Sequence, residues 1–107
     1  MRDTYEWIGV DLDGTLAEYG DWIGVEHIGK PIPLMIERVK NWIAEGKRVK
    51  IFTARVTHGE EAIHHIHKWL SVQGLPALEV TNVKDFDMVE LWDDRCVSVI
   101  TNTGITR

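Results

Sequence analysis

The sequence holds little that could tie the chain together covalently or anchor it in a membrane. Cys96 is the single cysteine among 107 residues, so an internal disulfide is excluded and a reducing, cytoplasmic environment is expected. No apolar run approaches the roughly 20 residues that a membrane-spanning helix needs, so no membrane partner is expected. Positive charge is also scarce, because 12 Lys and Arg stand against 17 Asp and Glu. This balance argues against a general surface for long nucleic acid.

What the sequence does have is the composition of one globular domain, expected to span residues 1–107. Strands are predicted at residues 5–12, 48–54, 77–82, 88–94 and 96–101. Helices are predicted over residues 33–46 and 59–73, where apolar residues recur at helical spacing. Alternating strands and helices are typical of a parallel sheet covered by helices. We therefore expect a Rossmann-like, three-layer α/β domain with a mostly parallel five-stranded sheet.

A stretch rich in Gly and Pro separates the first predicted strand from the first predicted helix. Its composition predicts a loop, which we call the flap (about residues 17–30). The flap is the segment expected to gate a site at the end of the first strand.

Polar side chains follow four of the predicted strands at their carboxyl ends. They are Asp11 and Asp13 at the end of the first strand, Thr53 at the end of the second with Arg55 just beyond it, Lys84 after the third, and Asp93 and Asp94 at the end of the fourth. In a parallel sheet these ends meet at one edge, where ligands bind. Like charges about 4 Å apart repel by roughly 1–4 kcal/mol, and a divalent cation removes that cost. Carboxylate oxygens in small number suit Mg²⁺, and the alternative is that one aspartate stays protonated.

A hydroxyl and an ammonium at the same edge would complete a cradle for a phosphoryl group. Thr53 and Lys84 supply them. A carboxylate in line with phosphorus can attack it and form an aspartyl phosphate. A second carboxylate nearby can protonate the leaving group and then activate water.

Four short segments carry a resemblance to a known family. "DLDGTL" (residues 11–16), "KIFTAR" (50–55), "TNVKDF" (81–86) and "ELWDD" (90–94) resemble, in family order, the four motifs of the haloacid dehalogenase (HAD) superfamily of phosphatases. The match covers nearly the whole chain. Only eight residues separate Lys84 from Asp93, which leaves little room for the helix that usually carries the third-motif lysine.

The resemblance implies a role for each matching residue. Asp11 would be the nucleophile and a metal ligand, and Asp13 the general acid and base, with its backbone carbonyl on the metal. The remaining roles are phosphoryl binding by Thr53 and Lys84, and Mg²⁺ binding by Asp93 and Asp94.

The family inserts cap domains at two places, and neither has room for one here, so the chain resembles small capless members of bacterial and phage type. An uncapped site suits a phosphorylated small molecule, a nucleotide or a nucleic-acid end, and a second subunit could shield it. Gly14, Trp22 and Arg55 are the candidate substrate contacts.

Three alternatives stay open beside the phosphatase. The "DDR" segment (residues 93–95) is also similar to the phosphatase half of phage polynucleotide kinase, which removes 3′-phosphates. A catalytically idle binding module would keep the same fold. A receiver domain would share the acidic pocket, Thr, Lys and Mg²⁺, but it places its acidic pair first and its phosphorylated aspartate on a middle strand. The middle strand here, "RVKIFTA" (48–54), carries no aspartate.

Overall fold

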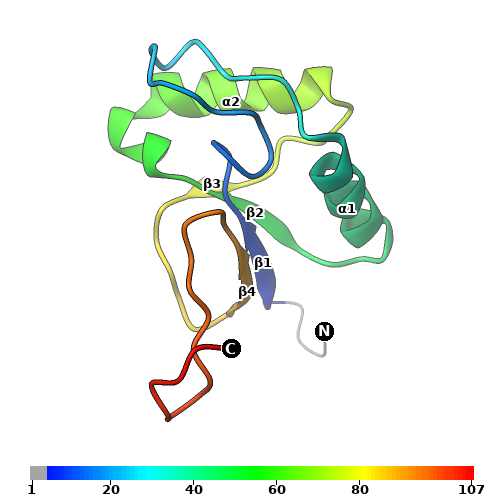
Figure 1. The fold of residues 1–107 in the computed structure, drawn as a ribbon. Coiled ribbons are helices and arrows are strands. Elements are labelled where there is room, and N and C mark those ends of the chain that lie inside the picture. The colour runs from blue at the N-terminus through cyan, green and yellow to red at the C-terminus, as the bar shows by residue number, and fades with distance from the viewer. Residues whose placement is uncertain (1–4) are drawn as a thin grey trace.

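Four parallel strands in the order β3-β2-β1-β4 form the centre of the computed structural model, which describes residues 5–107 (Figure 1). β1 (Trp7–Val10) pairs with β2 (Val49–Phe52) and with β4 (Met88–Trp92), and β3 (Val80–Thr81) pairs with β2. All four residues of β1 are buried, which is typical of a central strand in a parallel sheet. The predicted parallel α/β sheet is confirmed. The first four residues of the predicted domain lie outside the described part.

The two predicted helices are present. In α1 (Pro33–Ala44), proline occupies the first turn, where its fixed backbone angle suits a helix and its missing N–H leaves no donor unpaired. In α2 (Glu60–Val72), two acidic residues of the first turn favour the positive end of the helix dipole. A short three-ten helix, η1 (Ala54–His58), which was not predicted, joins β2 to α2.

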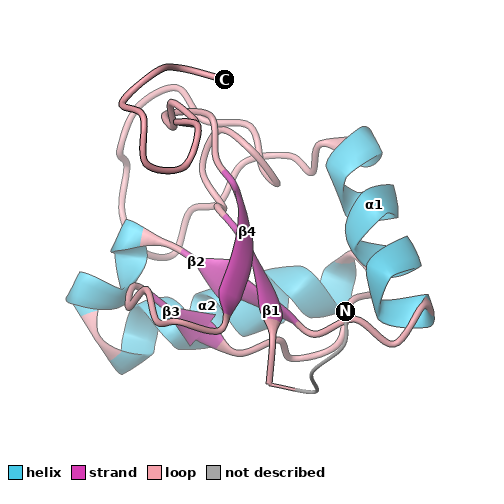
Figure 2. Ribbon diagram, turned by 90° about the horizontal axis from the view of Figure 1, so that it is seen from below, coloured by secondary structure: helices cyan, strands magenta, loops and turns pink. Residues whose placement is uncertain are grey.

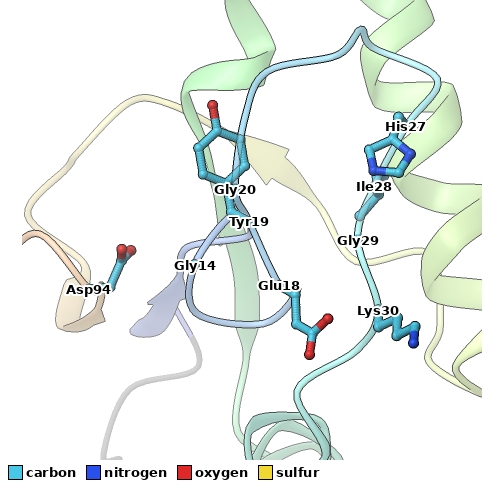
Figure 3. A pocket seen from close by; sticks show the side chains of 9 residues that line it. All are labelled: Gly14, Glu18, Tyr19, Gly20, His27, Ile28, Gly29, Lys30 and Asp94. Atoms are coloured by element: carbon cyan, nitrogen blue, oxygen red, sulfur yellow. The ribbon is translucent and has the colours of Figure 1, made fainter.

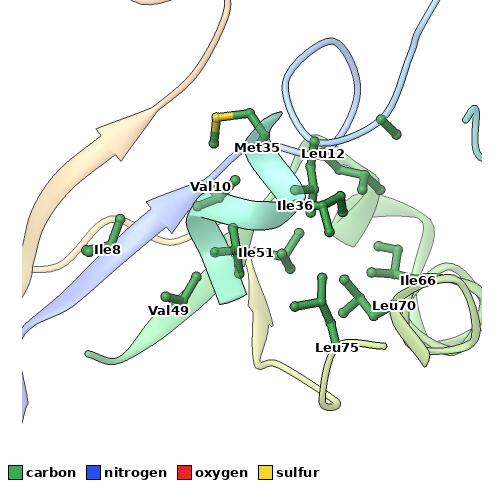
Figure 4. Close-up of a cluster of buried hydrophobic side chains, with 13 residues drawn as sticks. Ile8, Val10, Leu12, Met35, Ile36, Val49, Ile51, Ile66, Leu70 and Leu75 are labelled. Carbon is green, nitrogen blue, oxygen red and sulfur yellow. The ribbon is translucent and has the colours of Figure 1, made fainter. Parts of the chain in front are cut away.

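Both long helices pack on the same face of the sheet. The chain moves in one direction across the sheet from β1 to β2 and from β2 to β3, so right-handed crossovers put α1 and α2 on one side. Figure 4 shows the resulting core, in which strand side chains meet helix side chains. The buried cluster consists of Ile8, Val10, Leu12, Leu16, Ala17, Met35, Ile36, Val39, Val49, Ile51, Ile66, Leu70 and Leu75.

The opposite face of the sheet is crossed by one short segment, residues 82–87, which leads from β3 to β4. The indole N–H of Trp7 donates a hydrogen bond to Asp85 Oδ1 on this segment at 2.9 Å, and Trp7 is fully buried. Lys50 lies beside Trp7, with its Nζ 4.4 Å from the ring centre. The predicted third layer is therefore wrong for the described residues, because a six-residue crossing is too short to include a helix.

The predicted fifth strand, residues 96–101, does not join the sheet. It belongs to an exposed C-terminal arm (residues 95–107) that extends beyond the sheet in both views (Figures 1 and 2). The arm folds back on itself, with Val99 paired to Thr106 and the Ile100 N–H donating to the Ile105 carbonyl at 2.8 Å. The residues with a strand-like sequence therefore pair with one another in a local hairpin and not with the sheet, and Val97 is 72% exposed.

Leu70→Ala is expected to lower the free energy of unfolding by about 2–5 kcal/mol, because it leaves a cavity in the core beneath α2. Chemical denaturation measures the change. Val72→Ala in the same helix is the control, since Val72 is 82% exposed and its truncation should change stability by about 0.5 kcal/mol or less. Equal losses in the two variants would contradict this core.

Candidate active site

The carboxyl ends of β1, β2 and β4 open into a cavity of about 610 Å³. Its lining residues are Asp11, Asp13, Tyr19, Trp22, Phe52, Thr53, Ala54, Arg55, Thr57, His58, Asn82, Asp93, Asp94 and Arg95. Because β1 lies between β2 and β4, segments that are distant in sequence meet here. The structure therefore brings together most of the site residues predicted from the sequence.

Three carboxylates form a cluster within the cavity. One oxygen from each of Asp11, Asp93 and Asp94 can be chosen such that all three lie within 4.8 Å of one another. Burial, the negative charge of Asp93 and a hydrogen bond with Asp94 raise the pKa of Asp11 from 3.8 to about 7. A divalent cation among these oxygens would relieve the repulsion, and the donor set is one that Mg²⁺ accepts.

Asp94 is held in this cluster by the turn that follows β1. Thr15 Oγ1 donates to Asp94 Oδ1 at 3.3 Å and accepts from the Asp94 N–H at 3.1 Å. Gly14 has a φ of +91°, and a Cβ there would lie 2.5 Å from Asp94 Oδ2. Glycine is thus required both by the backbone and by the carboxylate above it. The role of Thr15 was missed, although it is part of the "DGT" motif.

Asp13 is not one of the three clustered carboxylates and is paired with Arg55. Arg55 donates from Nε to Asp13 Oδ2 at 2.8 Å and from Nη2 to Asp13 Oδ1 at 2.9 Å. This two-point pairing is the strongest geometry available between these groups. The predicted metal contact of Asp13 concerns its backbone carbonyl and stays a prediction.

Thr53 is buried at the end of β2, where its hydroxyl oxygen accepts the Arg55 backbone N–H at 3.1 Å. This bond caps η1 and orients the side chain into the cavity lining. A hydroxyl that accepts one bond can still donate one, so the geometry leaves Thr53 suited to a phosphoryl oxygen.

Lys84 does not line the cavity. It is exposed on the segment that crosses the sheet, residues 82–87, which has no helix to direct the side chain toward the site. The cavity instead includes Asn82, which directly follows β3, and Arg95, which follows the acidic pair. Their places after strands β3 and β4 are the signal that could have identified them.

The flap covers one side of the cavity. Ala17 pairs with Pro31 across its base, and the Glu18 N–H donates to the Lys30 carbonyl at 2.8 Å. Trp22, predicted to stack on a substrate, is 44% exposed and its ring already contacts two residues. It stacks on His58 with ring centres 4.9 Å apart, and it lies 4.9 Å from the guanidinium carbon of Arg55.

A second, more open cavity of about 850 Å³ is lined by residues of the flap and by Asp94. Figure 3 shows Asp94 on one side of it and the flap residues His27 and Lys30 on the other. Gly14 lines this second cavity and not the first. The two cavities share Tyr19 and Asp94, so a bound molecule could extend from one into the other.

Comparison with known proteins gives a fold relationship. A solved structure of a conserved protein from Bacteroides thetaiotaomicron matches with a TM-score of 0.67 and 25% sequence identity, over 85% of this chain and 77% of that one. No protein-family model matches the sequence, and the search of curated proteins finds no match. The match supports the α/β fold and carries no statement about activity. Separately, none of the helices within residues 5–107 has the length and apolar character needed to cross a membrane.

In buffer without divalent cations, the free energy of unfolding should fall as pH rises from about 4 to about 7. The folded state keeps the Asp11 proton up to a pKa of about 7, whereas the unfolded state loses it near 3.8, so the folded state binds more protons in this window. Thermal unfolding across this range measures the effect. Asp11→Asn should remove the part of this pH dependence that Asp11 contributes. An unchanged dependence of the free energy of unfolding on pH in that variant would contradict the raised pKa of Asp11.

Gly14→Ala is expected to weaken Mg²⁺ binding roughly 10–100-fold, because a Cβ there would displace Asp94 from the carboxylate cluster. Isothermal titration calorimetry with Mg²⁺ measures the change. Gly46→Ala is the matched control, since Gly46 also has positive φ (+82°) but has open space around it. Equal affinity in the two variants would show that the position of Asp94 does not matter for the cation.

Proposed function

We propose that this chain is a Mg²⁺-dependent phosphomonoester hydrolase of the HAD type, with Asp11 as the nucleophile. The observation that supports this most is the meeting of Asp11 with Asp93 and Asp94 from two neighbouring strands, with oxygens within 4.8 Å. Like charges this close together are costly to the fold, and clusters that raise the pKa of one member, as here for Asp11, are typical of functional sites.

The proposed reaction has two steps. First, an ionised Asp11 oxygen attacks phosphorus, the bond from phosphorus to the leaving oxygen breaks, and Asp13, which has to enter this step protonated beside Arg55, gives its proton to that oxygen. Then water attacks the phosphorus of the aspartyl phosphate and gives a proton to Asp13, and the bond from phosphorus to Asp11 breaks. Phosphate leaves, and both side chains return to their starting states.

The three-carboxylate cluster would hold the cation in this reaction. Bound Mg²⁺ would offset the repulsion among the carboxylates and the charge of the phosphoryl group. Asp11 would contribute its side chain, Asp13 its backbone carbonyl, and the remaining protein ligands would come from Asp93 and Asp94. Thr15 would act indirectly, because it holds Asp94 in place.

The phosphoryl group would be bound by Thr53 and by a cation. The resemblance assigns the cation to Lys84, whereas Arg95 is the unassigned cation of the cavity lining. The exposed position of Lys84 favours the second candidate function, a non-catalytic binding module that keeps the fold without efficient phosphoryl transfer.

The proposed substrates are a phosphorylated small molecule, a nucleotide or the 3′-phosphate end of a nucleic acid. The wide opening between the flap and Asp94 supports an extended substrate (Figure 3). A second copy that shields the site is also proposed. Its support is the exposed apolar surface of the C-terminal arm, which directly follows Asp94 and carries Val97 and Ile105.

The purified protein should hydrolyse p-nitrophenyl phosphate with Mg²⁺ and lose this activity in EDTA. Asp11→Asn should abolish turnover, because an amide cannot attack phosphorus, while the fold is retained. Phosphate release and circular dichroism measure the two outcomes.

Asp21→Asn is the control for this experiment, since Asp21 is exposed in the flap and lines neither cavity. It should keep wild-type turnover. An Asp11→Asn variant with wild-type turnover would overturn the assignment of the nucleophile. A wild type inactive on every phosphomonoester tested, with and without Mg²⁺, would favour the binding module.

A further inference from the structure

Arg55 is a buried arginine with no role in the proposed reaction. It lies in η1, directly beyond β2, and only 4% of it is exposed. Arginine is rarely buried to this degree unless its charge and its donors are matched. The partners of Arg55 therefore indicate what it does.

The first partner of Arg55 is the carboxylate of Asp13. Both carboxylate oxygens accept hydrogen bonds from Arg55, at 2.8 Å and 2.9 Å, so the plane of the Asp13 carboxylate is fixed by the plane of the guanidinium. Asp13 is four-fifths buried, which protects the pair from solvent.

The other set of partners belongs to the flap. Arg55 Nη2 donates to the His27 carbonyl at 2.8 Å, and Nη1 donates to the Val25 carbonyl at 3.4 Å. The Trp22 ring lies 4.9 Å from the guanidinium carbon. Three flap residues thus meet the same rigid group that holds Asp13, and Nη2 is shared directly between Asp13 and His27.

We infer that Arg55 is a positioning residue that orients Asp13 for proton transfer and couples that orientation to the flap. The inference rests on the proposed function, because it needs Asp13 as the acid and base. A lysine could keep the charge but could not hold two carboxylate oxygens and two flap carbonyls at once, since it has one compact ammonium in place of a planar fork.

The choice of leaving group separates this role from a merely structural one. Nitrophenolate leaves without a proton, whereas an alkoxide leaves poorly unless an acid protonates it. Loss of a correctly placed Asp13 should therefore slow an alkyl phosphate far more than p-nitrophenyl phosphate. General damage to the fold would slow both substrates alike.

The experiment measures kcat/KM for propyl phosphate and for p-nitrophenyl phosphate in wild type, Arg55→Lys, Asp13→Asn and Arg48→Lys. We expect Arg55→Lys to lose about 100-fold or more on propyl phosphate and less than about tenfold on p-nitrophenyl phosphate. Asp13→Asn, which breaks the same pair from the other side, should show the same selectivity. Arg48→Lys is the control, because Arg48 is exposed and pairs with Glu79 away from the cavity.

Equal losses on the two substrates in Arg55→Lys would overturn the inference and leave the proposed function intact. Wild-type values of kcat/KM on both substrates in Arg55→Lys would also overturn the inference. A wild type that hydrolyses neither these two substrates nor any other phosphomonoester tested, including nucleotides and 3′-phosphate ends, would refute the proposed function itself, and the role of Arg55 would fall with it.

Hydrogen exchange tests the coupling to the flap without any turnover. The amides of Glu18 and His27 are hydrogen-bonded within the flap, so they report its order. Both Arg55→Lys and Asp13→Asn should raise their exchange rates about tenfold or more, while amides of β1 stay protected. Unchanged flap exchange in both variants would show that Arg55 does not join the flap to Asp13.

Discussion

Repulsion among Asp11, Asp93 and Asp94 is the constraint on which the candidate site depends. β1 and β4 are neighbours in the sheet, so their carboxyl ends deliver all three side chains to one place. The fold then fixes Asp94 with Thr15 and leaves room for it at Gly14. The three carboxylates are therefore held in one defined arrangement. The packing of the core on the helix side of the sheet has to offset the repulsion between them.

The fourth carboxylate, Asp13, has the opposite environment. It is neutralised by Arg55, while Asp11 is surrounded by negative charge that raises its pKa to about 7. Two aspartates one residue apart are thus placed in environments that push them toward different chemistry. The two carboxyls therefore differ in what they need: Asp11 needs a bound cation to be an ionised nucleophile, whereas the charge of Asp13 is already paired with Arg55. Through its bonds to the flap carbonyls, Arg55 also connects the flap to Asp13.

The sequence predicts the sheet, both helices and the gathering of polar groups at one edge, because these follow from periodicity and from the carboxyl ends of strands. The predicted third layer needed a longer connection than the chain has, and the eight residues between Lys84 and Asp93 already indicated this. The structure adds the contacts that no local pattern encodes. The six-residue crossing at 82–87 removes the predicted third layer and leaves Lys84 exposed. Residues 96–101 have the pattern of a strand, but they pair within the C-terminal arm. The bond between Arg55 and Asp13 joins residues 42 positions apart, so it became visible only in the structure.

The most direct test of phosphoryl transfer through Asp11 is to trap the covalent intermediate. The protein is mixed with Mg²⁺ and a substrate and quenched in acid, the aspartyl phosphate is reduced with borohydride, and the modified peptide is identified by mass spectrometry. We predict that the reduced side chain is Asp11 and that the Asp11→Asn variant yields none. A reduced aspartate other than Asp11, or turnover without any reduced aspartate, would contradict the proposal.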